Sequence, residues 1–304
     1  MLTIGTRGSA LALAQTTWVR NQILSRFPDT RVTLKVIKTS ADKDAASSIR
    51  SGSGVGVFVK EIEEALLARE IDLAVHSMKD VPTTIPDGLE IGAIPEREDP
   101  HDALITRGQA GTLDELRSGS VIGTGSVRRI AQILVLRSDL RILDIRGNVD
   151  TRLQKLASGA YDAIILACAG LNRLGLGGRI SARLPFDQML PAPGQGALAL
   201  EIRKDDPIAH PLIAALHHVP SAVSVLAERA FLRRMGGGCN APVAVHATYD
   251  EGRVKIEGLL AALDGSRVIR DSVIGDHDMA EEAAAALADR IRTQGVRDRL
   301  ESLL

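Results

Sequence analysis

The chain has 304 residues, of which 45% are hydrophobic and 25% charged, and its formal net charge is −1. This length suits about two domains or three small ones, and the composition excludes a disordered chain. The charge balance argues against a globally basic nucleic-acid binder, and the few Phe, Trp and Tyr residues cannot build a base-stacking surface. We find no signal peptide and no apolar run of about 18 residues, so we expect a cytoplasmic protein without membrane contact.

The first part of the chain alternates short apolar segments with helical patterns, which is typical of a largely parallel sheet covered by helices. Ser9 is placed to cap the first helix. After this first helix we predict a strand over 31–37, a helix over 58–69, and strands over 72–75 and 89–94.

Two breaks divide the chain. Pro95–Pro100 places two prolines around four charged residues and resembles an interdomain linker, and Pro191–Gly196 is a second break, where we expect a return to the first unit. Between the breaks the alternation restarts. We predict strands over 120–123, 141–145 and 163–167, and helices over 127–137 and 149–157.

The last part of the chain has a different pattern. A helix over 221–235 precedes strands over 243–248, 254–260 and 268–273, joined by short turns typical of hairpins. We predict a final helix that Asp278 caps and Gly295 ends. The expected domains are an α/β domain over 1–95 with 196–216, an α/β domain over 100–192, and a small α+β domain over 219–304 with a three-stranded sheet and helices.

Arginine supplies most of the 37 basic residues, and several arginines follow predicted strands. In open α/β sheets ligands bind at the carboxyl ends of the strands, and arginine suits two-pronged recognition of carboxylate or phosphate. We therefore favour a site for an anion with several such groups, although solvated surface arginines remain the alternative. The candidates are Arg7, Arg128, Arg129, Arg146, Arg152 and Arg173.

Four further segments are candidates for chemistry. His76–Asp80 follows a buried strand, so Asp80 is either an acid, base or cation-stabilising carboxylate or part of a surface ion pair with Lys79, while His76 is expected to be structural. Cys168 lies in an apolar run and is expected to be buried.

Cys239 follows three glycines and two arginines, which favours an exposed, reactive or covalently modified thiol, with an ordinary thiol as the alternative. No metal-ligand spacing surrounds it. Gly52–Gly56 lacks the P-loop register and is interpreted as a lid loop.

Together these segments resemble the porphobilinogen deaminase family, also called hydroxymethylbilane synthases, over nearly the whole chain. The most specific matches are His76-Ser77-Met78-Lys79-Asp80 and Arg146-Gly147-Asn148 with Thr151-Arg152-Leu153. The other matching segments are Thr6–Ser9, Phe58–Glu61, Glu96–Pro100, Gly123–Arg129, Tyr161–Ala163, Ala169–Leu171, Pro193–Gly196 and Gly237–Cys239.

The resemblance implies a fold and a reaction. The fold is two α/β domains like type II periplasmic binding proteins, with a cleft between them, plus the small third domain. The reaction is a stepwise, deaminating, head-to-tail condensation of four porphobilinogen molecules on a covalent dipyrromethane cofactor, followed by hydrolytic release of hydroxymethylbilane. Such an enzyme is a transferase of tetrapyrrole (porphyrin, haem) biosynthesis.

The resemblance also assigns roles to residues. Cys239 is expected to hold the cofactor through a thioether, and Asp80 and Lys79 to act in catalysis. Further cofactor contacts are expected from Asp80, Lys79, Ser126, Arg128, Arg129, Arg146 and Asn148. Substrate contacts are expected from Arg7, Ser9, Arg146, Arg152, Arg173 and Gln195. The implied partners are porphobilinogen and the growing polypyrrole chain, with a monomeric protein, no metal and no nucleic acid.

The lid loop departs from the family pattern, because Ser51 and Val55 stand where the family carries lysines. Two alternatives therefore stay in view. One is an inactive deaminase homologue, which the loop substitutions motivate. The other is a cytosolic two-lobed anion-binding protein, which would have no use for Cys239 on a third domain.

Overall fold

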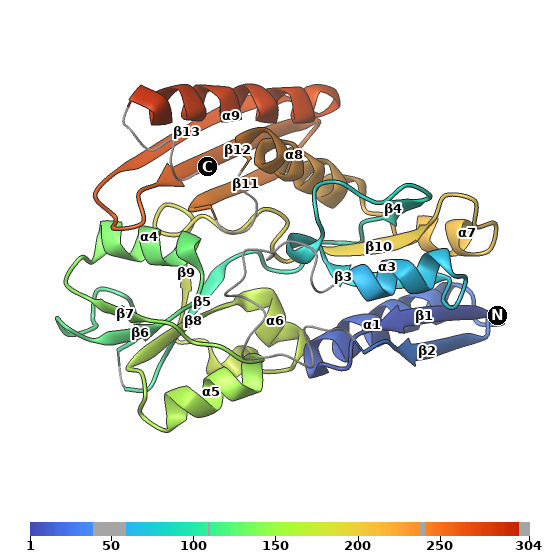
Figure 1. Cartoon of the computed structure of the whole chain (residues 1–304), viewed down its shortest axis with the longest axis horizontal. Helices are drawn as coiled ribbons and strands as arrows, with labels where there is room; N and C mark the ends of the chain where they lie inside the picture. The colour runs from blue at the N-terminus through green and yellow to red at the C-terminus, as the bar shows by residue number, and fades with distance from the viewer. Residues whose placement is uncertain (39–58, 109, 237–240, 298–304) are drawn as a thin grey trace. The chain divides into compact units, whose positions relative to one another are not determined.

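The structure, a computed structural model, describes residues 1–38, 59–108, 110–236 and 241–297. By its internal contacts the chain divides into two compact units (Figure 1). Unit 1 comprises Met1–Glu98 and Ala197–Ala222, and unit 2 comprises Asp99–Gly196 and Val223–Leu304. Ser51, Val55 and Cys239 lie outside the described residues.

Unit 1 is built on a five-stranded sheet in the order β2-β1-β3-β10-β4. Its strands are β1 (Leu2–Thr6), β2 (Val32–Val36), β3 (Leu73–Ser77), β4 (Leu89–Ala93) and β10 (Leu198–Arg203). β1 pairs in parallel with β2 and β3, whereas β10 runs antiparallel to both β3 and β4. The central strands β3 and β10 are almost entirely buried, as expected for strands covered on both faces.

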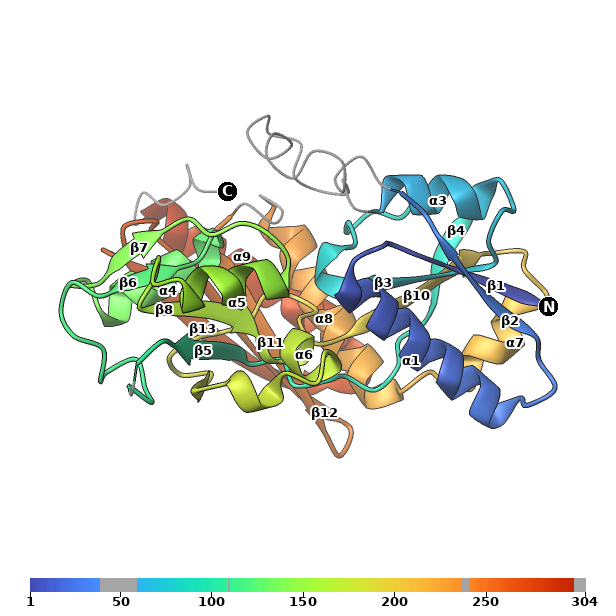
Figure 2. The ribbon, with the colours of Figure 1, turned by 90° about the horizontal axis from the view of Figure 1, so that it is seen from below.

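Among the described residues, three helices cover this sheet: α1 (Ala10–Arg26), α3 (Lys60–Leu67) and α7 (Ala209–Ala214). Ser9 caps α1 as predicted, because its hydroxyl accepts a hydrogen bond from the Ala12 backbone N–H at 3.3 Å. α1 and α7 pack in one apolar cluster with the strands, and Ile62 and Leu66 of α3 pack in another. Figure 2 shows α1 and α3 on opposite sides of the sheet.

Unit 2 contains a second five-stranded sheet, in the order β7-β6-β8-β5-β9. Its strands are β5 (Asp102–Thr106), β6 (Val121–Gly123), β7 (Arg141–Leu143), β8 (Ala163–Ala167) and β9 (Ala182–Leu184). Its helices are α4 (Val127–Leu136), α5 (Val149–Ala157) and α6 (Cys168–Arg173). Ile133 of α4 belongs to one apolar cluster, and Leu153 of α5 and Leu171 of α6 belong to another.

The two sheets share one connection pattern, although the sequence shows no repeat. In each, three strands are parallel and the fourth in order is antiparallel to both of its neighbours. That strand follows a proline-containing segment that interrupts the pattern of strands and helices: β5 comes after Pro95–Pro100 and β10 after Pro191–Gly196. The expectation of largely parallel sheets thus holds for only part of each sheet. The antiparallel strands β5 and β10 were not predicted from the sequence pattern.

The C-terminal part forms a three-stranded antiparallel sheet of β11 (Val243–Asp250), β12 (Arg253–Ala261) and β13 (Val268–Asp276). Glu251 and Gly252 have φ values of 43° and 83°, as a two-residue hairpin turn of the primed type requires. The helices α8 (Val219–Met235) and α9 (Ala280–Arg297) share a core with one face of this sheet. This confirms the predicted α/β class and the small C-terminal sheet with helices.

The other face of the C-terminal sheet packs against α4 within unit 2. Ala244 and Leu259 of the sheet share an apolar cluster with Ala131 of α4. The turn at Gly265 approaches the same helix so closely that an added Cβ would lie 2.6 Å from the Leu134 Cβ. These contacts place the C-terminal sheet and the second five-stranded sheet in one compact unit.

Two expectations about the last helix were wrong. Asp278 lies within a 3₁₀ turn over His277–Met279, and α9 begins after it at Ala280. Gly295 does not end the helix but lies inside it. A Cβ at this position would lie 3.0 Å from the Leu260 side chain on the sheet. Gly295 therefore permits a close approach of helix and sheet instead of a helix end.

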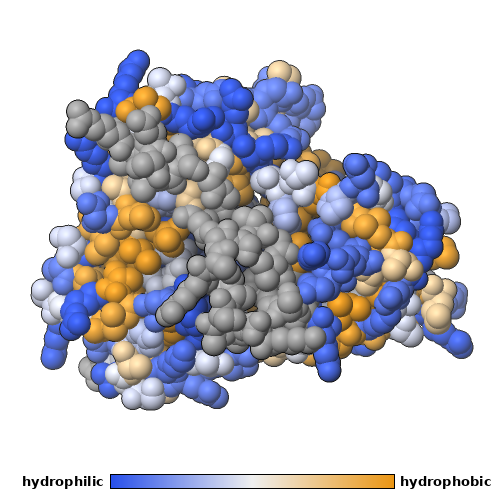
Figure 3. Space-filling view, viewed as in Figure 1, coloured by the Kyte–Doolittle hydropathy of each residue, from blue (hydrophilic) through white to orange (hydrophobic). Residues whose placement is uncertain are grey.

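The visible surface mixes hydrophilic and hydrophobic residues (Figure 3), as is normal for a globular protein. Within the part of the chain that the structure describes, no helix is long and apolar enough to cross a membrane.

Candidate active site

A pocket in unit 1 lies at the carboxyl ends of β1 and β3, which are parallel neighbours. Arg7 and Ser9 come from the link between β1 and α1, and Ser77 and Asp80 come from the end of β3 and the 3₁₀ turn over Met78–Asp80 that follows it. The topology therefore brings together residues that are about 70 positions apart in the sequence, as expected for an open α/β sheet.

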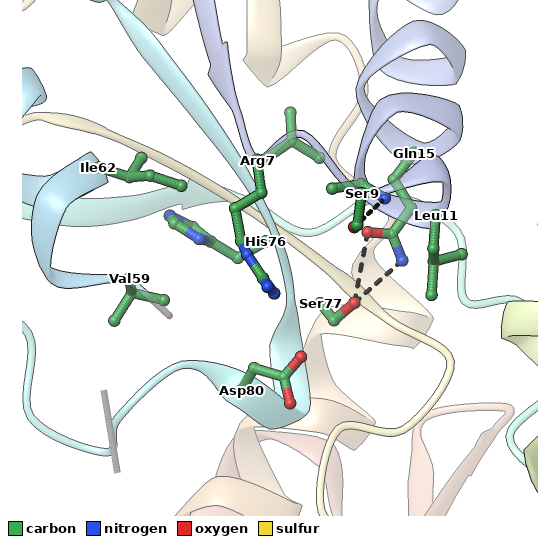
Figure 4. Close-up of a pocket in the computed structure, with 11 residues that line it drawn as sticks. Arg7, Ser9, Leu11, Gln15, Val59, Ile62, His76, Ser77 and Asp80 are labelled. Carbon is green, nitrogen blue, oxygen red and sulfur yellow. Dashed lines mark hydrogen bonds between the residues drawn. The ribbon is translucent and has the colours of Figure 1, made fainter. Parts of the chain in front are cut away.

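Polar contacts order one wall of this pocket. The Gln15 side-chain Nε2 donates a hydrogen bond to the Ser77 hydroxyl at 2.9 Å. Figure 4 shows Arg7 pointing toward the segment that carries Ser77 and Asp80. Asp80 is exposed and lines the pocket, while the half-buried Lys79 is not among the lining residues. A solvated carboxylate and a guanidinium group thus face the same space.

His76, expected to be structural, also lines this pocket. Its Nε2 lies 2.9 Å from the Glu201 Oε2 of β10, and both side chains are buried. His76 therefore does more than fill space, because one of its ring nitrogens contacts a buried carboxylate.

In unit 2 a buried aspartate connects three of the predicted site residues. Asp102 accepts hydrogen bonds from Arg128 at 2.7 Å, from Arg129 at 2.6 and 3.1 Å, and from the Gln195 Nε2 at 3.0 Å. Burial by itself would raise the pKa of Asp102, but the charges of Arg128 and Arg129 outweigh burial and hold this pKa well below its usual range. Asp102 is therefore an ionised carboxylate shared by two buried guanidinium groups.

Arg152 extends this region of positive charge. Its pKa is lowered by burial and then by the charges of Arg129 and Arg146, with Asp144 acting in the opposite direction. Arg146 donates to Asp144 at 2.7 Å, and Arg152 donates to the Gly147 carbonyl at 2.8 Å. Arginine charges thus lie near one another here with only partial compensation by carboxylates, which favours binding of an anion.

The remaining candidates have mainly local contacts. Asn148 caps α5, since its Oδ1 accepts a hydrogen bond from the Thr151 backbone N–H at 2.9 Å. Ser126 precedes α4 and its side chain makes no capping bond. Arg173 donates to the Gly196 carbonyl at 2.7 Å. Cys239 lies outside the described residues, and Cys168 is buried as predicted.

Sequence reasoning missed two acidic residues, Asp102 and Glu201. Asp102 directly precedes the apolar run of β5, and Glu201 interrupts the apolar run of β10, so an acidic residue in a buried strand was the available signal. The described residues contain no group of three His, Cys, Asp or Glu side chains that could hold a metal ion.

Comparison with known families gives two matches. Residues 2–210 match the family described as "Porphobilinogen deaminase, dipyromethane cofactor binding domain", and residues 222–293 match "Porphobilinogen deaminase, C-terminal domain".

Similar proteins of full length are found in several bacteria. A porphobilinogen deaminase of Thermus thermophilus is 50% identical over 304 residues, which is 100% of this chain and 99% of that protein. Proteins with the same name from Pelobacter propionicus and Deinococcus radiodurans are 47% and 46% identical, covering 99% of this chain and 97% and 98% of their own.

Among solved structures, a periplasmic substrate-binding protein of an ABC transporter from Coxiella burnetii gives a TM-score of 0.44 at 14% identity, covering 75% of this chain and 97% of its own. A methionine-binding protein gives 0.45 at 13% identity, covering 71% and 89%.

Proposed function

The chain belongs to the porphobilinogen deaminase family, and we propose that it joins four porphobilinogen molecules head to tail, with loss of ammonia at each addition, and releases hydroxymethylbilane by hydrolysis. It is accordingly an enzyme of the transferase class that serves porphyrin biosynthesis, with dipyrromethane as cofactor. A simple anion-binding protein is not favoured, because relatives along the full length of the chain are deaminases.

The observation that carries this proposal is the charge of the Asp102 cluster. Two guanidinium groups, Arg128 and Arg129, share one carboxylate, so the buried cluster keeps a net positive charge. Arg152 adds another charge close enough to Arg129 to lower its own pKa. Buried positive charge of this kind is stabilised by an anionic ligand, and each pyrrole unit of substrate and cofactor carries carboxylates.

These residues fit the cofactor on charge grounds. Arg128, Arg129 and Arg146, with Ser126 and Asn148, would hold its carboxylates, and we propose that Cys239 attaches it through a thioether. When bound, the cofactor supplies the pyrrole carbon to which the first substrate is added. This attachment rests on the family resemblance and on the position of Cys239 in the sequence. The thiol follows two arginines and three glycines, a setting that favours a reactive thiolate.

Substrate binding is assigned to arginines and polar groups of both units. Arg7 and Ser9 line the pocket with Asp80, while Arg146 and Arg152 belong to the positive region of unit 2. Arg173 is held by the Gly196 carbonyl, and Gln195 by Asp102. We propose that these hydrogen bonds fix the two side chains in position to contact substrate. Each guanidinium can bind a carboxylate with two hydrogen bonds.

Asp80 is proposed as the catalytic carboxylate. Loss of ammonia leaves positive charge on the substrate carbon, and a fixed carboxylate that stays ionised stabilises that charge. Asp80 lines the pocket in unit 1 together with Ser77 and Gln15, and we propose that its carboxylate accepts a pyrrole N–H. Lys79, directly before Asp80 in sequence, is proposed to act with it in catalysis.

We also propose three domains: 1–95 with 196–216, 100–192 and 219–304. The three separate sheets support this division. We further propose a monomer in the cytoplasm that acts on porphobilinogen and the growing chain, without membrane contact. The net charge of −1 supports the absence of nucleic acid among its partners.

Intact mass and turnover test the proposal. Freshly purified protein should carry an adduct of two linked pyrroles, and Cys239→Ser should lack it and fail to turn over porphobilinogen. Cys168→Ser is the matched control and should keep both the adduct and the activity. An unmodified wild-type mass without turnover would instead support an anion-binding protein or an inactive homologue.

A further inference from the structure

Three titratable side chains lie buried beside the pocket of unit 1. Glu63 comes from α3, His76 from β3 and Glu201 from β10, and they are 8%, 5% and 1% exposed. None of the roles proposed above uses them. His76 alone of the three lines the pocket that holds Asp80.

The hydrogen bonding of this cluster is incomplete. His76 and Glu201 contact each other at 2.9 Å, yet the second oxygen of Glu201 and the Oε1 of Glu63 are buried without a partner among the described residues. A buried, ionised carboxylate oxygen without a donor is costly, and two such carboxylates repel each other. The cluster can lower this cost by holding a proton on Glu63 in addition to the one that His76 shares with Glu201.

The charged groups around Glu63 do not remove this requirement. β1 carries no titratable residue, and β4 carries only Glu90, which lies 3.4 Å from His210. On β10, Arg203 binds the backbone oxygens of α3 and of the following turn. On α3 itself, Glu64 is exposed and lies 3.9 Å from Lys60. On the link between β1 and α1, Arg7 lines the same pocket as His76. The charges that act on Glu63 are those of Glu201, His76 and, to a smaller extent, Glu64.

The cluster reaches the pocket through His76 and not through a direct contact with Asp80. β3 places His76 four residues before Asp80, on the strand that leads into the 3₁₀ turn. Figure 4 shows the His76 ring turned toward Val59 and Ile62, away from the Asp80 carboxylate. An effect of the cluster on the pocket is therefore electrostatic rather than a proton transfer to Asp80.

We propose that Glu63, His76 and Glu201 form a proton-holding cluster that sets the charge of the pocket and thereby how tightly it holds a carboxylate of the substrate. With Glu63 protonated, the His76–Glu201 pair is neutral overall. When Glu63 loses its proton, the cluster gains a negative charge that opposes a bound carboxylate. This rests on the proposed function, since it concerns the substrate of the same pocket.

The acidity of Glu63 supports this behaviour. Burial, and next the charge of Glu201, raises the pKa of Glu63 to about 7, with His76 acting in the opposite direction. The cluster would therefore change its charge near neutral pH. We expect KM for porphobilinogen to rise about threefold as the pH increases through about 7, the size of effect for one charge acting across part of a protein, while kcat does not fall.

The test compares Glu63→Gln with Glu64→Gln, a control on the same helix whose side chain is exposed. KM and kcat of the cofactor-loaded protein are measured between about pH 6 and about pH 8.5. Glu63→Gln should show a KM that no longer rises with pH. Glu64→Gln removes only an exposed charge, the smallest of those acting on Glu63, and should keep the rise. An unchanged rise of KM in Glu63→Gln, or no rise in an active wild type, would overturn the cluster proposal.

A second readout does not depend on turnover. The NMR signal of the Glu63 side-chain carboxyl carbon, assigned by comparison with Glu63→Gln, should shift near pH 7 in wild type and in Glu64→Gln. If Glu63→Gln does not fold, Glu201→Gln replaces it and should lower the pH at which Glu63 loses its proton, because the charge of Glu201 raises the pKa of Glu63. An unchanged Glu63 titration would overturn the proposal. Failure of porphobilinogen turnover by adduct-bearing wild type would reject the proposed function instead, and leave the NMR result to decide on the cluster.

Discussion

Arg129 binds Asp102 through two nitrogens, Nε and Nη2, which donate to one carboxylate oxygen at 3.1 and 2.6 Å. The third nitrogen of the guanidinium, Nη1, donates to the Ile165 carbonyl at 2.9 Å, so Arg129 is fixed in place. Arg128 shares the other oxygen of Asp102 and the Leu190 carbonyl. The carboxylate therefore determines where two cationic groups of unit 2 can point.

Asp102→Asn should destabilise the fold strongly. The substitution keeps the size of the side chain but removes the carboxylate charge that pairs with two buried guanidinium groups, and breaking a buried ion pair costs about 3–5 kcal/mol. Urea unfolding measures the change in free energy. Asp289→Asn is the control, because its ion pair with Arg234 is exposed and should contribute little. Equal stability of the two variants would contradict this role of Asp102.

Asp80→Asn should fold normally but turn over slowly. Asp80 is exposed, so its charge contributes little to stability, whereas loss of a fixed group that stabilises transition-state charge lowers the rate about 100-fold or more. Single-turnover kinetics and thermal unfolding separate the two effects. Asp87→Asn, an exposed aspartate in the loop before β4, should leave both unchanged. Near-normal turnover in Asp80→Asn would remove Asp80 from the mechanism.

Arg152→Leu should lose activity without losing stability. Arg152 would bind a substrate carboxylate, and removal of a hydrogen bond to a charged group costs about 1.5–3 kcal/mol, or about 10- to 100-fold in kcat/KM. Its removal also relieves repulsion with Arg129 and Arg146, so the unfolding free energy should not fall. Arg179→Leu, which removes an exposed arginine, is the control. A large loss of stability would show that Arg152 is structural.

Cys168 should resist alkylation in the native protein. Burial, followed by the charge of Asp99, raises the pKa of Cys168 to about 12, so almost no thiolate is present at neutral pH. Iodoacetamide followed by mass analysis measures this. If Cys239 carries the cofactor, native protein should take up no label and unfolded protein one label, at Cys168. Labelling of native Cys168 would contradict its burial.

Glu63→Gln should change how stability depends on pH. The pKa of Glu63 is higher in the folded than in the unfolded state, so this residue favours folding at low pH. That contribution is lost as the pH rises from about 4.5 to about 7, by up to about 3 kcal/mol. The variant should therefore gain stability relative to wild type as the pH rises through this range. Urea unfolding at several pH values measures the difference, and a constant difference would contradict the raised pKa.

Local properties of the sequence were enough to predict much of the fold. The Ser9 cap, the hairpin at Asp250–Gly252 and the burial of Cys168 depend on neighbours that are close in the chain, and the structure confirms all three. The prediction that Arg7 and Asp80 come together also succeeded, because the carboxyl ends of parallel strands meet at one edge of a sheet.

Contacts between distant residues decided the rest. The antiparallel placement of β10 between β3 and β4 brings Glu201 against His76, 125 positions away, and no local pattern shows this. Gly295 looks like a helix end in sequence, yet the sheet beside it decides that it is a packing position.

The sequence alone thus determined which residue types were available: arginines after strands, an aspartate after His76 and a cysteine after glycines. Only the tertiary structure decided which of them share charge, since Asp102 joins Arg128, Arg129 and Gln195 across sequence separations of 26, 27 and 93. The reason is physical. Electrostatic interactions depend on distance and burial in space, and chain folding, not sequence spacing, sets both.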